Sequence, residues 1–385
     1  MARKTPKFNL ALTIILCIIF VAIGYVGGGY VYLFLKCKHE IKNIPVYTSG
    51  DLAFHFLELG NKYTGDCTYI KAGDVDILID AGSATDSIPT ITAYINEYVT
   101  DSTLEYVIVT HAHKDHYAGF ATNESTNSIF DLYSVGTIID FSQTNQSSTG
   151  VMYNHYLRER GEAINKGAKH YTALECVNET NGASKVYDLG NDITFTVLEH
   201  KYYEQKDSSG ENNHSVCTLF TQGDRNFLFT GDLEEKGEES LVSLNDLPHC
   251  DLYKAGHHGS KTSSSDTLLN AITPDICAVC CCAGNYEYTD NNLNNFPTQD
   301  FINRISKHTD KVYVTTLGLP VWSEEDDKYK NDSFTSMNGN IVVSSGSKGI
   351  VVNCSNNNTL LKDTDWFKEN RTCPNDWLVA WIYKL

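Results

Sequence analysis

Three histidines and one aspartate stand within six positions of the segment VTHAHKDHYAGF, directly after an apolar run that ends at Val109. His111, His113, Asp115 and His116 would repel one another or stay half solvated without a common partner, and a divalent cation takes such side chains as ligands. Their spacing does not follow one helix face, because residues i and i+2 lie on opposite sides of a helix. It suits a loop that leaves a strand end. The alternative is a chance cluster of surface histidines.

Other polar residues repeat this arrangement, in which an apolar strand ends at a side chain able to reach the same centre. Asp80 lies in DILIDAG, Asp232 closes NFLFTGD, and His257 and His258 follow DLYKAG. His214 precedes the apolar segment SVCTLF. The combination of five strand ends with ligand-type residues is a strong indication of a metal site, although each alone is weak.

Alternating apolar and amphipathic segments predict the elements that position these residues. Helices are expected at 88–99, where Pro89 suits the first turn, and at 150–166, 234–244, 264–272 and 298–307. Strands are expected at 52–59, 67–73, 75–82, 105–113, 135–141, 193–199, 215–220, 226–230, 251–255 and 275–283. This order describes two sheets covered by helices. Beyond residue 311 we expect added strands and a polar tail, with a hairpin turned at Gly346 to Gly349.

The stretch from Asn9 to Leu35 carries no charge and exceeds the roughly 20 residues that a bilayer core requires. It predicts one transmembrane helix, because the apolar run is longer than that of a cleaved signal peptide. Lysines flank it on both sides, and the free amino terminus favours an inside N-terminus, which would put the rest outside the cytoplasm. The predicted organisation is an anchor at 1–36, a linker at 37–50, a catalytic domain at 51–310 and a strand-rich extension at 311–385.

The charge and the cysteines set limits on function. A formal net charge of −18 works against non-specific attraction to a polyanion, so a nucleic-acid substrate would need a local basic channel or the metals themselves. Twelve cysteines in an exported chain suggest disulfides. Cys280, Cys281 and Cys282 are consecutive, however, and their apolar surroundings favour small buried residues on a core strand.

The motifs together resemble the metallo-β-lactamase superfamily, and most closely the hydrolase domain of ComEC-type competence proteins. The resemblance spans about 53–305 and rests on LELGNKYTGDCTYI, ILIDAG, THAHKDHYAG, NNHSVCTLF, FLFTGD, KAGHHGSKTSSS and CAGNY. It implies an α/β fold, the four-layer αββα metallo-β-lactamase sandwich, with the site at one edge of the two sheets.

The resemblance also assigns roles to individual residues. It implies one metal on His111, His113 and His214, a second on Asp115, His116 and His257, and Asp232 as the bridge, although a surface histidine is the alternative for His214. The metals would be zinc or manganese. Asp80 would orient a histidine ligand from behind. The remaining assignments cover catalysis or contact with substrate, and comprise Asp115, Asp232, His258, Lys261, Ser260, Thr262, Asn285 and Tyr286.

One loop departs from the family pattern. Competence-type hydrolases usually follow the asparagine and tyrosine of this loop with Gly-His-Pro, whereas this chain has NYEYTDNNLNNFP, with Phe296 before Pro297. If the missing histidine protonates the leaving group, either His258 substitutes for it or the substrate differs.

The sequence therefore predicts a membrane-anchored hydrolase with two metals. Such a pair can lower the pKa of a bridging water and stabilise the attacking and leaving oxygens, which suits a phosphodiester of the nucleic-acid or phosphorylcholine type. A lactone, thioester or β-lactam hydrolase is the alternative within enzymes. A binding or assembly module with structural metals is the alternative outside them.

Overall fold

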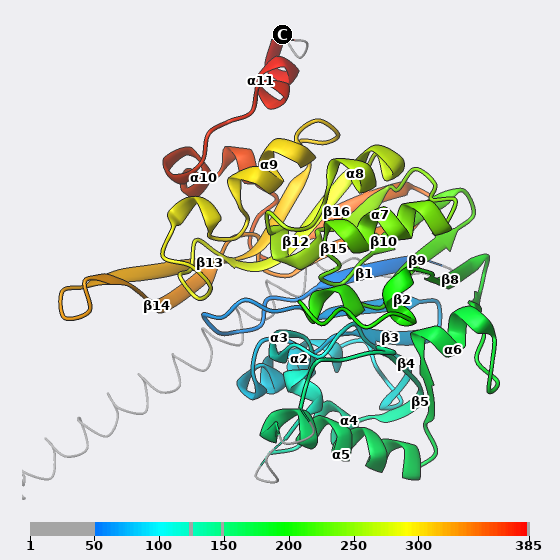
Figure 1. The fold of residues 1–385 in the computed structure, drawn as a ribbon. Helices are drawn as coiled ribbons and strands as arrows, with labels where there is room; N and C mark the ends of the chain where they lie inside the picture. The colour runs from blue at the N-terminus through cyan, green and yellow to red at the C-terminus, as the bar shows by residue number, and fades with distance from the viewer. Residues whose placement is uncertain (1–50, 123–125, 148–149, 383–385) are drawn as a thin grey trace, which may run out of the picture. The chain divides into compact units, whose positions relative to one another are not determined.

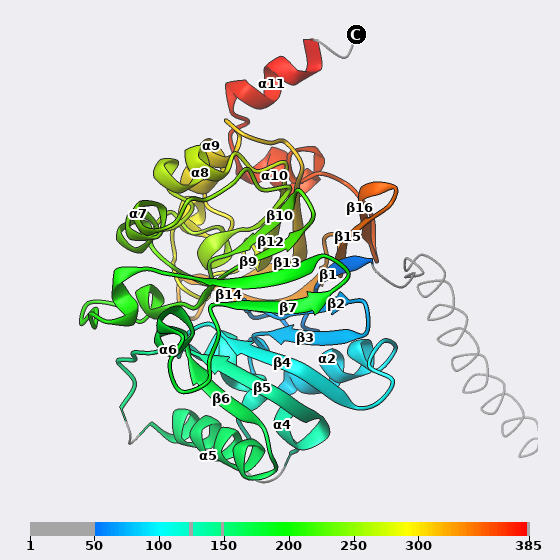
Figure 2. The same cartoon turned by 90° about the vertical axis from the view of Figure 1, so that its right-hand side faces the viewer.

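The computed structural model describes residues 51–122, 126–147 and 150–382. These residues lie in one compact unit that spans Tyr47–Leu385. Within this unit two sheets of eight strands pack face to face, and helices cover the outer face of each sheet (Figures 1 and 2). The predicted transmembrane segment at 9–35 lies outside the described residues. Among the helices of the described ranges, none is long and apolar enough to span a bilayer.

The first sheet carries the strand that precedes the histidine cluster. Its strands β3, β4, β5 and β6 pair in parallel, while β15, β1, β2 and β3 pair antiparallel. The strand order is β16 (Gly349–Cys354), β15 (Ile341–Gly346), β1 (Leu52–Phe56), β2 (Thr68–Ala72), β3 (Val75–Ile79), β4 (Thr103–Val109), β5 (Ser134–Asp140) and β6 (Lys169–Thr172).

The second sheet carries the strands that lead to Asp232 and to the histidine pair. Strands β10, β11, β12 and β13 pair in parallel. The order is β14 (Lys328–Ser336), β13 (Val312–Ser323), β12 (Ile276–Ala283), β11 (Leu252–Lys254), β10 (Arg225–Phe229), β9 (Cys217–Gln222), β8 (Ile193–Leu198) and β7 (Val186–Gly190). Because parallel strands end at the same edge of a sheet, residues that follow β10 and β11 come together.

Helices form the two outer layers. The outer face of the first sheet is covered by α2 (Ile88–Ile95), α4 (Ile129–Leu132) and α5 (Val151–Asn165) (Figures 1 and 2). The outer face of the second sheet is covered by α7 (Glu235–Leu244), α8 (Asp266–Ile272) and α9 (Gln299–Ile305). The other α-helices are α3 (Lys114–Tyr117), α6 (Ala173–Asn178), α10 (Asp365–Asn370) and α11 (Asn375–Ile382). Short 3₁₀ helices lie at Thr85–Ser87, Ala118–Phe120, Lys201–Tyr203, Asn212–His214, Gly256–Gly259, Asn292–Asn294 and Leu361–Asp363.

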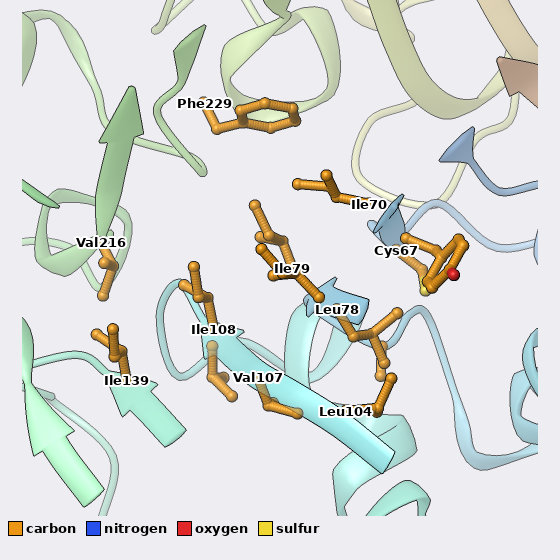
Figure 3. Packing of buried hydrophobic residues seen from close by; sticks show 14 of the residues in the cluster. Cys67, Ile70, Leu78, Ile79, Leu104, Val107, Ile108, Ile139, Val216 and Phe229 are labelled. Atoms are coloured by element: carbon orange, nitrogen blue, oxygen red, sulfur yellow. The ribbon is translucent and has the colours of Figure 1, made fainter. Parts of the chain in front are cut away.

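The core lies between the two sheets. Phe54 of β1 contacts Phe227 and Phe229 of β10, with ring centroids 4.7 and 5.5 Å apart. Ile79 of β3 belongs to the same buried cluster (Figure 3). All five residues of β1 are buried because the strand is covered on both faces: Phe54 points to the second sheet, and His55 packs against Tyr94 of α2.

The consecutive cysteines lie on the fully buried strand β12, as the apolar pattern predicts. All ten cysteines in the described ranges are free thiols. Burial raises the pKa of Cys280 and Cys281 well above the usual thiol range, so these thiols stay protonated and pack as small apolar side chains.

Most predicted elements are present with ends shifted by a few residues, and the hairpin turned at 346–349 is β15–β16. The predicted boundary at residue 310 falls between β12 and β13, which are neighbours in one sheet, while β15 pairs with β1 in the other. The last part of the chain therefore completes both sheets. The elements that were not predicted are α3, α4, β6, α6, β7, α10 and α11.

Candidate metal centre

The histidine cluster lies where β4 ends and α3 begins. The backbone at His113 is extended, and Lys114 starts the helix. Alternation along the extended segment places His111 and His113 side by side, with His111 Nε2 3.0 Å from His113 Nδ1. The first turn of α3 then brings Asp115 and His116 back toward the same point. A strand end followed by a tight helical turn therefore gathers four side chains that neither element alone would gather.

Asp232 is the point on which the imidazoles converge. Its Oδ2 lies 3.1 Å from His116 Nε2 and 3.4 Å from His258 Nε2. His111 Nε2 and His257 Nε2 each lie 4.0 Å from the same oxygen. Residues from the ends of β4, β10 and β11 thus meet at one carboxylate oxygen, which is the arrangement the strand-end pattern predicts.

Glycine at position 231 makes this approach possible. Gly231 has φ +54°, and a Cβ there would lie 2.8 Å from Ser215 Oγ and 2.9 Å from Thr110 Cβ. The next residue, Asp232, accordingly turns in against β4, and its backbone N–H donates to Ser215 Oγ at 3.0 Å. A side chain at residue 231 would push the carboxylate away from the histidines.

The second histidine motif is held by an unusual backbone. His257 and His258 both adopt left-handed conformations, with φ +46° and +56°, which cost free energy in residues other than glycine. This turn directs the Nε2 atoms of both rings at Asp232. His258 Nε2 also lies 3.4 Å from Asp115 Oδ2, so the turn joins the carboxylates of the two sheets.

Asp80 contacts His116 from the side opposite Asp232. His116 donates from Nδ1 to Asp80 Oδ2 at 2.7 Å, and Thr110 donates to the same carboxylate through its N–H at 2.8 Å and its hydroxyl at 2.7 Å. With Nδ1 so engaged, the neutral imidazole presents the Nε2 lone pair to the centre, as a metal ligand requires. This geometry agrees with the orienting role predicted for Asp80, which stays a prediction.

Two residues of the centre were not assigned from the sequence. Asp66, two residues before β2, belongs with His116, Asp232 and His258 to a buried group whose ligand atoms all lie within 4.8 Å of one another. Lys254, the last residue of β11, contacts the Asp66 carboxylate and lies 3.9 Å from Asp232 Oδ1. Lys254 could have been noticed in the sequence, because it is a charged residue at the end of the apolar segment DLYKAG.

The electrostatics of the centre are dominated by buried charges that face one another. Burial disfavours protonated His116, but Asp232 and Asp80 outweigh burial and raise its pKa well above the usual range. Burial likewise works against ionised Asp232, and His116 and His258 lower its pKa. The pKa of Lys254 is raised because Asp66 and Asp232 outweigh its own burial. Burial also opposes ionisation of Asp66, but Lys254 and His258 lower its pKa. Asp66 and Asp232 are therefore buried anions that need nearby cations.

The donor set fits a metal. Asp66 Oδ1, Asp232 Oδ1 and His258 Nε2 are buried and have no hydrogen-bond partner among the described residues. Leaving such atoms unsatisfied costs about 1–3 kcal/mol each, and a divalent cation removes this cost by taking oxygen and nitrogen lone pairs. The composition of the group, carboxylates with imidazoles, suits zinc or manganese alike.

His214 lies outside this convergence, contrary to the ligand role predicted for it. Its Nε2 accepts from Asp207 N at 3.1 Å, and its Nδ1 faces Glu211 Oε1 at 3.5 Å. The reason is local: β9 begins only at Cys217, and His214 closes a 3₁₀ turn in which its ring contacts Asp207 and Glu211. Ser215 takes the place beside the cluster, with Oγ 3.4 Å from His111 Nδ1.

The residues after the histidine pair form a braced loop at the edge of the centre. Thr262 Oγ1 lies 3.0 Å from His257 Nδ1 and 3.1 Å from Ser260 Oγ. Arg304 donates to the carbonyls of this loop, at 2.7 Å for Ser263. Lys261 is exposed, and its Nζ lies 3.5 Å from Asn294 Oδ1, so its described contact leads away from the centre rather than into it.

Asn285 and Tyr286 support the following loop rather than the metal ligands. Asn285 donates to Lys62 O at 3.2 Å, and the Tyr286 ring stacks on Tyr329 with centroids 4.9 Å apart. A third residue of this loop was missed. The hydroxyl of Tyr288 donates to Asp115 Oδ2 at 2.9 Å, a contact that an irregular loop does not reveal in sequence.

Comparison with known proteins identifies the superfamily to which the centre belongs. Residues 60–123 and 205–283 match the family model of the metallo-beta-lactamase superfamily. Together with two facing sheets, outer helices and strand ends converging on Asp232, this match makes this part of the chain a metallo-β-lactamase superfamily domain, as the motifs predicted. Proteins of this fold are generally metal-dependent hydrolases.

The curated relatives are competence proteins of the ComEC type. The chain is 29% identical over 124 residues to ComE operon protein 3 of Bacillus subtilis, covering 32% of this chain and 15% of that protein. It is 36% identical over 109 residues to competence protein ComA of Neisseria gonorrhoeae, covering 28% and 15%. The match thus spans about a seventh of these relatives. Among solved structures, the metallo-beta-lactamase fold protein YhfI of Bacillus subtilis is 14% identical, with 53% and 70% coverage and a TM-score of 0.31.

Proposed function

We propose that this chain is a metal-dependent hydrolase of phosphodiester bonds. The observation that carries the proposal is the meeting of four imidazoles at Asp232 Oδ2, beside buried carboxylate and imidazole atoms without hydrogen-bond partners. A structural site needs no more than one closed coordination shell, whereas this centre offers donors for two cations and opens to solvent at Asp115 and His257.

The residues that would hold the cations are those the strand ends bring together. They comprise His111, His113, Asp115, His116, Asp232 and His257, with Asp66 and His258 added by the geometry. The chemistry that two such cations supply is a more acidic water and neutralisation of the charge on phosphoryl oxygens. The protein orients His116 through Asp80. It also supplies a buried charged group beneath the centre, in which Lys254 lies beside Asp66 and Asp232.

A phosphodiester suits this centre better than a neutral ester. The KAGHHGSKTSSS motif, on which the resemblance to competence-type hydrolases rests, favours a phosphodiester, and so does Asp232 as a carboxylate shared by several imidazoles. The acidic excess of the chain, 48 acidic against 30 basic residues, works against an anionic substrate, so the cations of the centre would have to offset it. Nucleic acids and phosphorylcholine-type polymers are the two substrate classes that we propose. A lactone, thioester or β-lactam substrate would need no such offset and is the rival that the experiment must separate.

We further propose that residues 9–35 anchor the chain in a membrane and that the hydrolase acts outside the cytoplasm. The uncharged length of this segment supports an anchor, and the arrangement of its flanking lysines supports the orientation only slightly. Protease protection in sealed vesicles tests the orientation, because the domain at 51–382 would be digested only when it faces the outside.

The direct test is turnover by the purified full chain in detergent, loaded with manganese or zinc. We expect metal-dependent hydrolysis of bis(p-nitrophenyl) phosphate and a loss of more than about 100-fold in Asp232→Asn, because the substitution weakens the common ligand. Asp300→Asn, an exposed position on α9, is the matched control. Hydrolysis of a lactone or of a chromogenic cephalosporin instead of the phosphodiester would move the function to the rival class. A metal-loaded protein that hydrolyses none of them would indicate a binding module.

A further inference from the structure

The loop between β12 and α9 reaches the open side of the metal centre. The Tyr288 hydroxyl donates to Asp115 Oδ2 at 2.9 Å, and the residue is 54% exposed. Asp115 is itself the most open carboxylate of the centre: its side chain is 17% exposed, against 4% for Asp66 and 2% for Asp232. Tyr288 therefore stands between the buried donors and the solvent from which a substrate arrives.

Contacts from three parts of the chain hold this phenol in place. Glu287 accepts from Thr64 N at 2.9 Å, which ties the loop to the segment before Asp66. Tyr286 N donates to Asn331 Oδ1 at 2.7 Å, which ties it to β14. The Tyr288 ring packs on Phe296 with centroids 5.5 Å apart.

Phe296 extends this support to the histidine pair. Its ring centroid lies 5.7 Å from that of His257 and 5.7 Å from that of His258. The same loop lacks the histidine that the resemblance to competence-type hydrolases leads one to expect. In its place the loop directs a phenol at the ligand carboxylate, on a packed aromatic support rather than on a free tip.

A phenol at this position is a hydrogen-bond donor. The Tyr288 hydroxyl donates to Asp115 Oδ2 at 2.9 Å, so its oxygen carries a proton that can be offered in a hydrogen bond. A neutral O–H group beside a phosphoryl site meets negative charge wherever it develops, and in phosphodiester hydrolysis it develops on the leaving oxygen.

We infer that Tyr288 is a catalytic residue whose hydroxyl hydrogen-bonds to the leaving-group oxygen of the substrate. The inference rests on the proposed phosphodiester function. In the reaction a water oxygen forms a bond to phosphorus, and the bond from phosphorus to the leaving oxygen breaks with its electron pair on that oxygen. The proton lost by the water is balanced by the proton gained by the leaving alcohol, and Tyr288 keeps its own proton throughout.

The test compares two substrates that differ only in the leaving group, methyl phenyl phosphate and methyl p-nitrophenyl phosphate. Phenolate is the poorer leaving group and depends more on a donor. For Tyr288→Phe in the full chain we expect kcat/KM on the phenyl ester to fall about 100-fold, the lower end for loss of one hydrogen-bond donor to a developing oxyanion, and that on the p-nitrophenyl ester to fall less than about 3-fold. Tyr329→Phe, which removes the hydroxyl of the ring that stacks on Tyr286, should change neither.

A second readout separates this role from support of the metal ligand. Metal content and the dissociation constant for manganese, measured by chelator competition, should stay within about 3-fold of wild type in Tyr288→Phe, since phenylalanine keeps the ring on Phe296. Equal losses on both esters, a weakened metal constant or no loss at all would each overturn the inference. A wild-type chain that hydrolyses neither ester would instead overturn the proposed function, and the inference with it.

Discussion

Replacement of Lys254 by methionine should destabilise the metal-free protein more than any exposed ion-pair change. The lysine is 3% exposed, contacts Asp66 and lies 3.9 Å from Asp232 Oδ1. Methionine matches its length and keeps its apolar packing. The substitution therefore removes one positive charge and leaves two buried carboxylates facing each other.

The size of the effect follows from these distances. At 3.9 Å and an effective dielectric constant of about 20, one pair of unit charges interacts by about 4 kcal/mol. Loss of one partner from a buried pair typically costs about 3–5 kcal/mol. Burial opposes protonation of His258, but Asp232 and Asp66 raise its pKa to about 10, so a second positive charge remains near both carboxylates at neutral pH. We therefore expect the lower end, about 3 kcal/mol.

The assay is urea unfolding of residues 47–385 after chelation, followed by tryptophan fluorescence. Lys307→Met is the control, because Lys307 pairs with Asp266 at 2.8 Å but is half exposed, and such pairs contribute about 1 kcal/mol or less. The double variant Lys254→Met with Asp66→Asn should recover part of the loss, since it removes the stranded charge. If Lys254→Met costs no more than Lys307→Met, the buried-charge explanation of this centre is wrong.

Three further outcomes can be measured on the same protein. Burial lowers the pKa of His200 to about 4, whereas the unfolded chain binds this proton at about pH 6.5. The free energy of unfolding should therefore fall by about 3 kcal/mol as the pH drops from about 6.5 to about 4. Urea unfolding at a series of pH values should show this fall in the wild type and not in His200→Gln. Manganese or zinc at about a thousandfold excess over Kd should stabilise the protein by about 4 kcal/mol, and in calorimetry His116→Asn should lose most of this gain. Trp377→Ala should cost about 3–5 kcal/mol because the indole is 1% exposed, whereas Leu378→Ala, on a side chain 52% exposed, should change the unfolding midpoint little.

The fold was largely predictable because its strands are strong local patterns. Apolar runs such as those of β3, β4 and β10 are followed within two residues by Gly or by a ligand-type residue. The hydrophobic pattern and the residues that end a strand therefore mark the same boundaries. The missed segment from β6 to β7 has no such agreement. β6 is four residues long and none of them is buried, and most of β7 is exposed as well. These strands form through pairing with β5 and β8, which local sequence does not display.

The candidate site was predictable to the extent that its residues follow strand ends. His111, His116, Asp232 and His257 each follow a parallel strand, and the sheet order brings those ends together. Asp66 precedes an antiparallel strand instead, and it joins the group because the connection between β1 and β2 contacts the second sheet: Thr64 Oγ1 accepts from Cys282 N at 3.3 Å, and Asp66 contacts Lys254. These contacts form only when the two sheets pack, so no spacing in the sequence could reveal them.

Ser215, and not the predicted His214, lies beside the histidine cluster, which shows why residue type alone misleads at such a centre. A histidine beside a strand was predicted as a ligand because its chemistry suits a metal, but the direction of a side chain depends on where the strand begins. Here the backbone of Val216 already donates to Thr110 O at 2.8 Å, which fixes Ser215 at the last position facing His111. His214 lies one residue before that point, in a turn where its Nε2 accepts from Asp207 N at 3.1 Å. Ser215 therefore contacts His111 and the backbone of Asp232, whereas His214 hydrogen-bonds within its own loop.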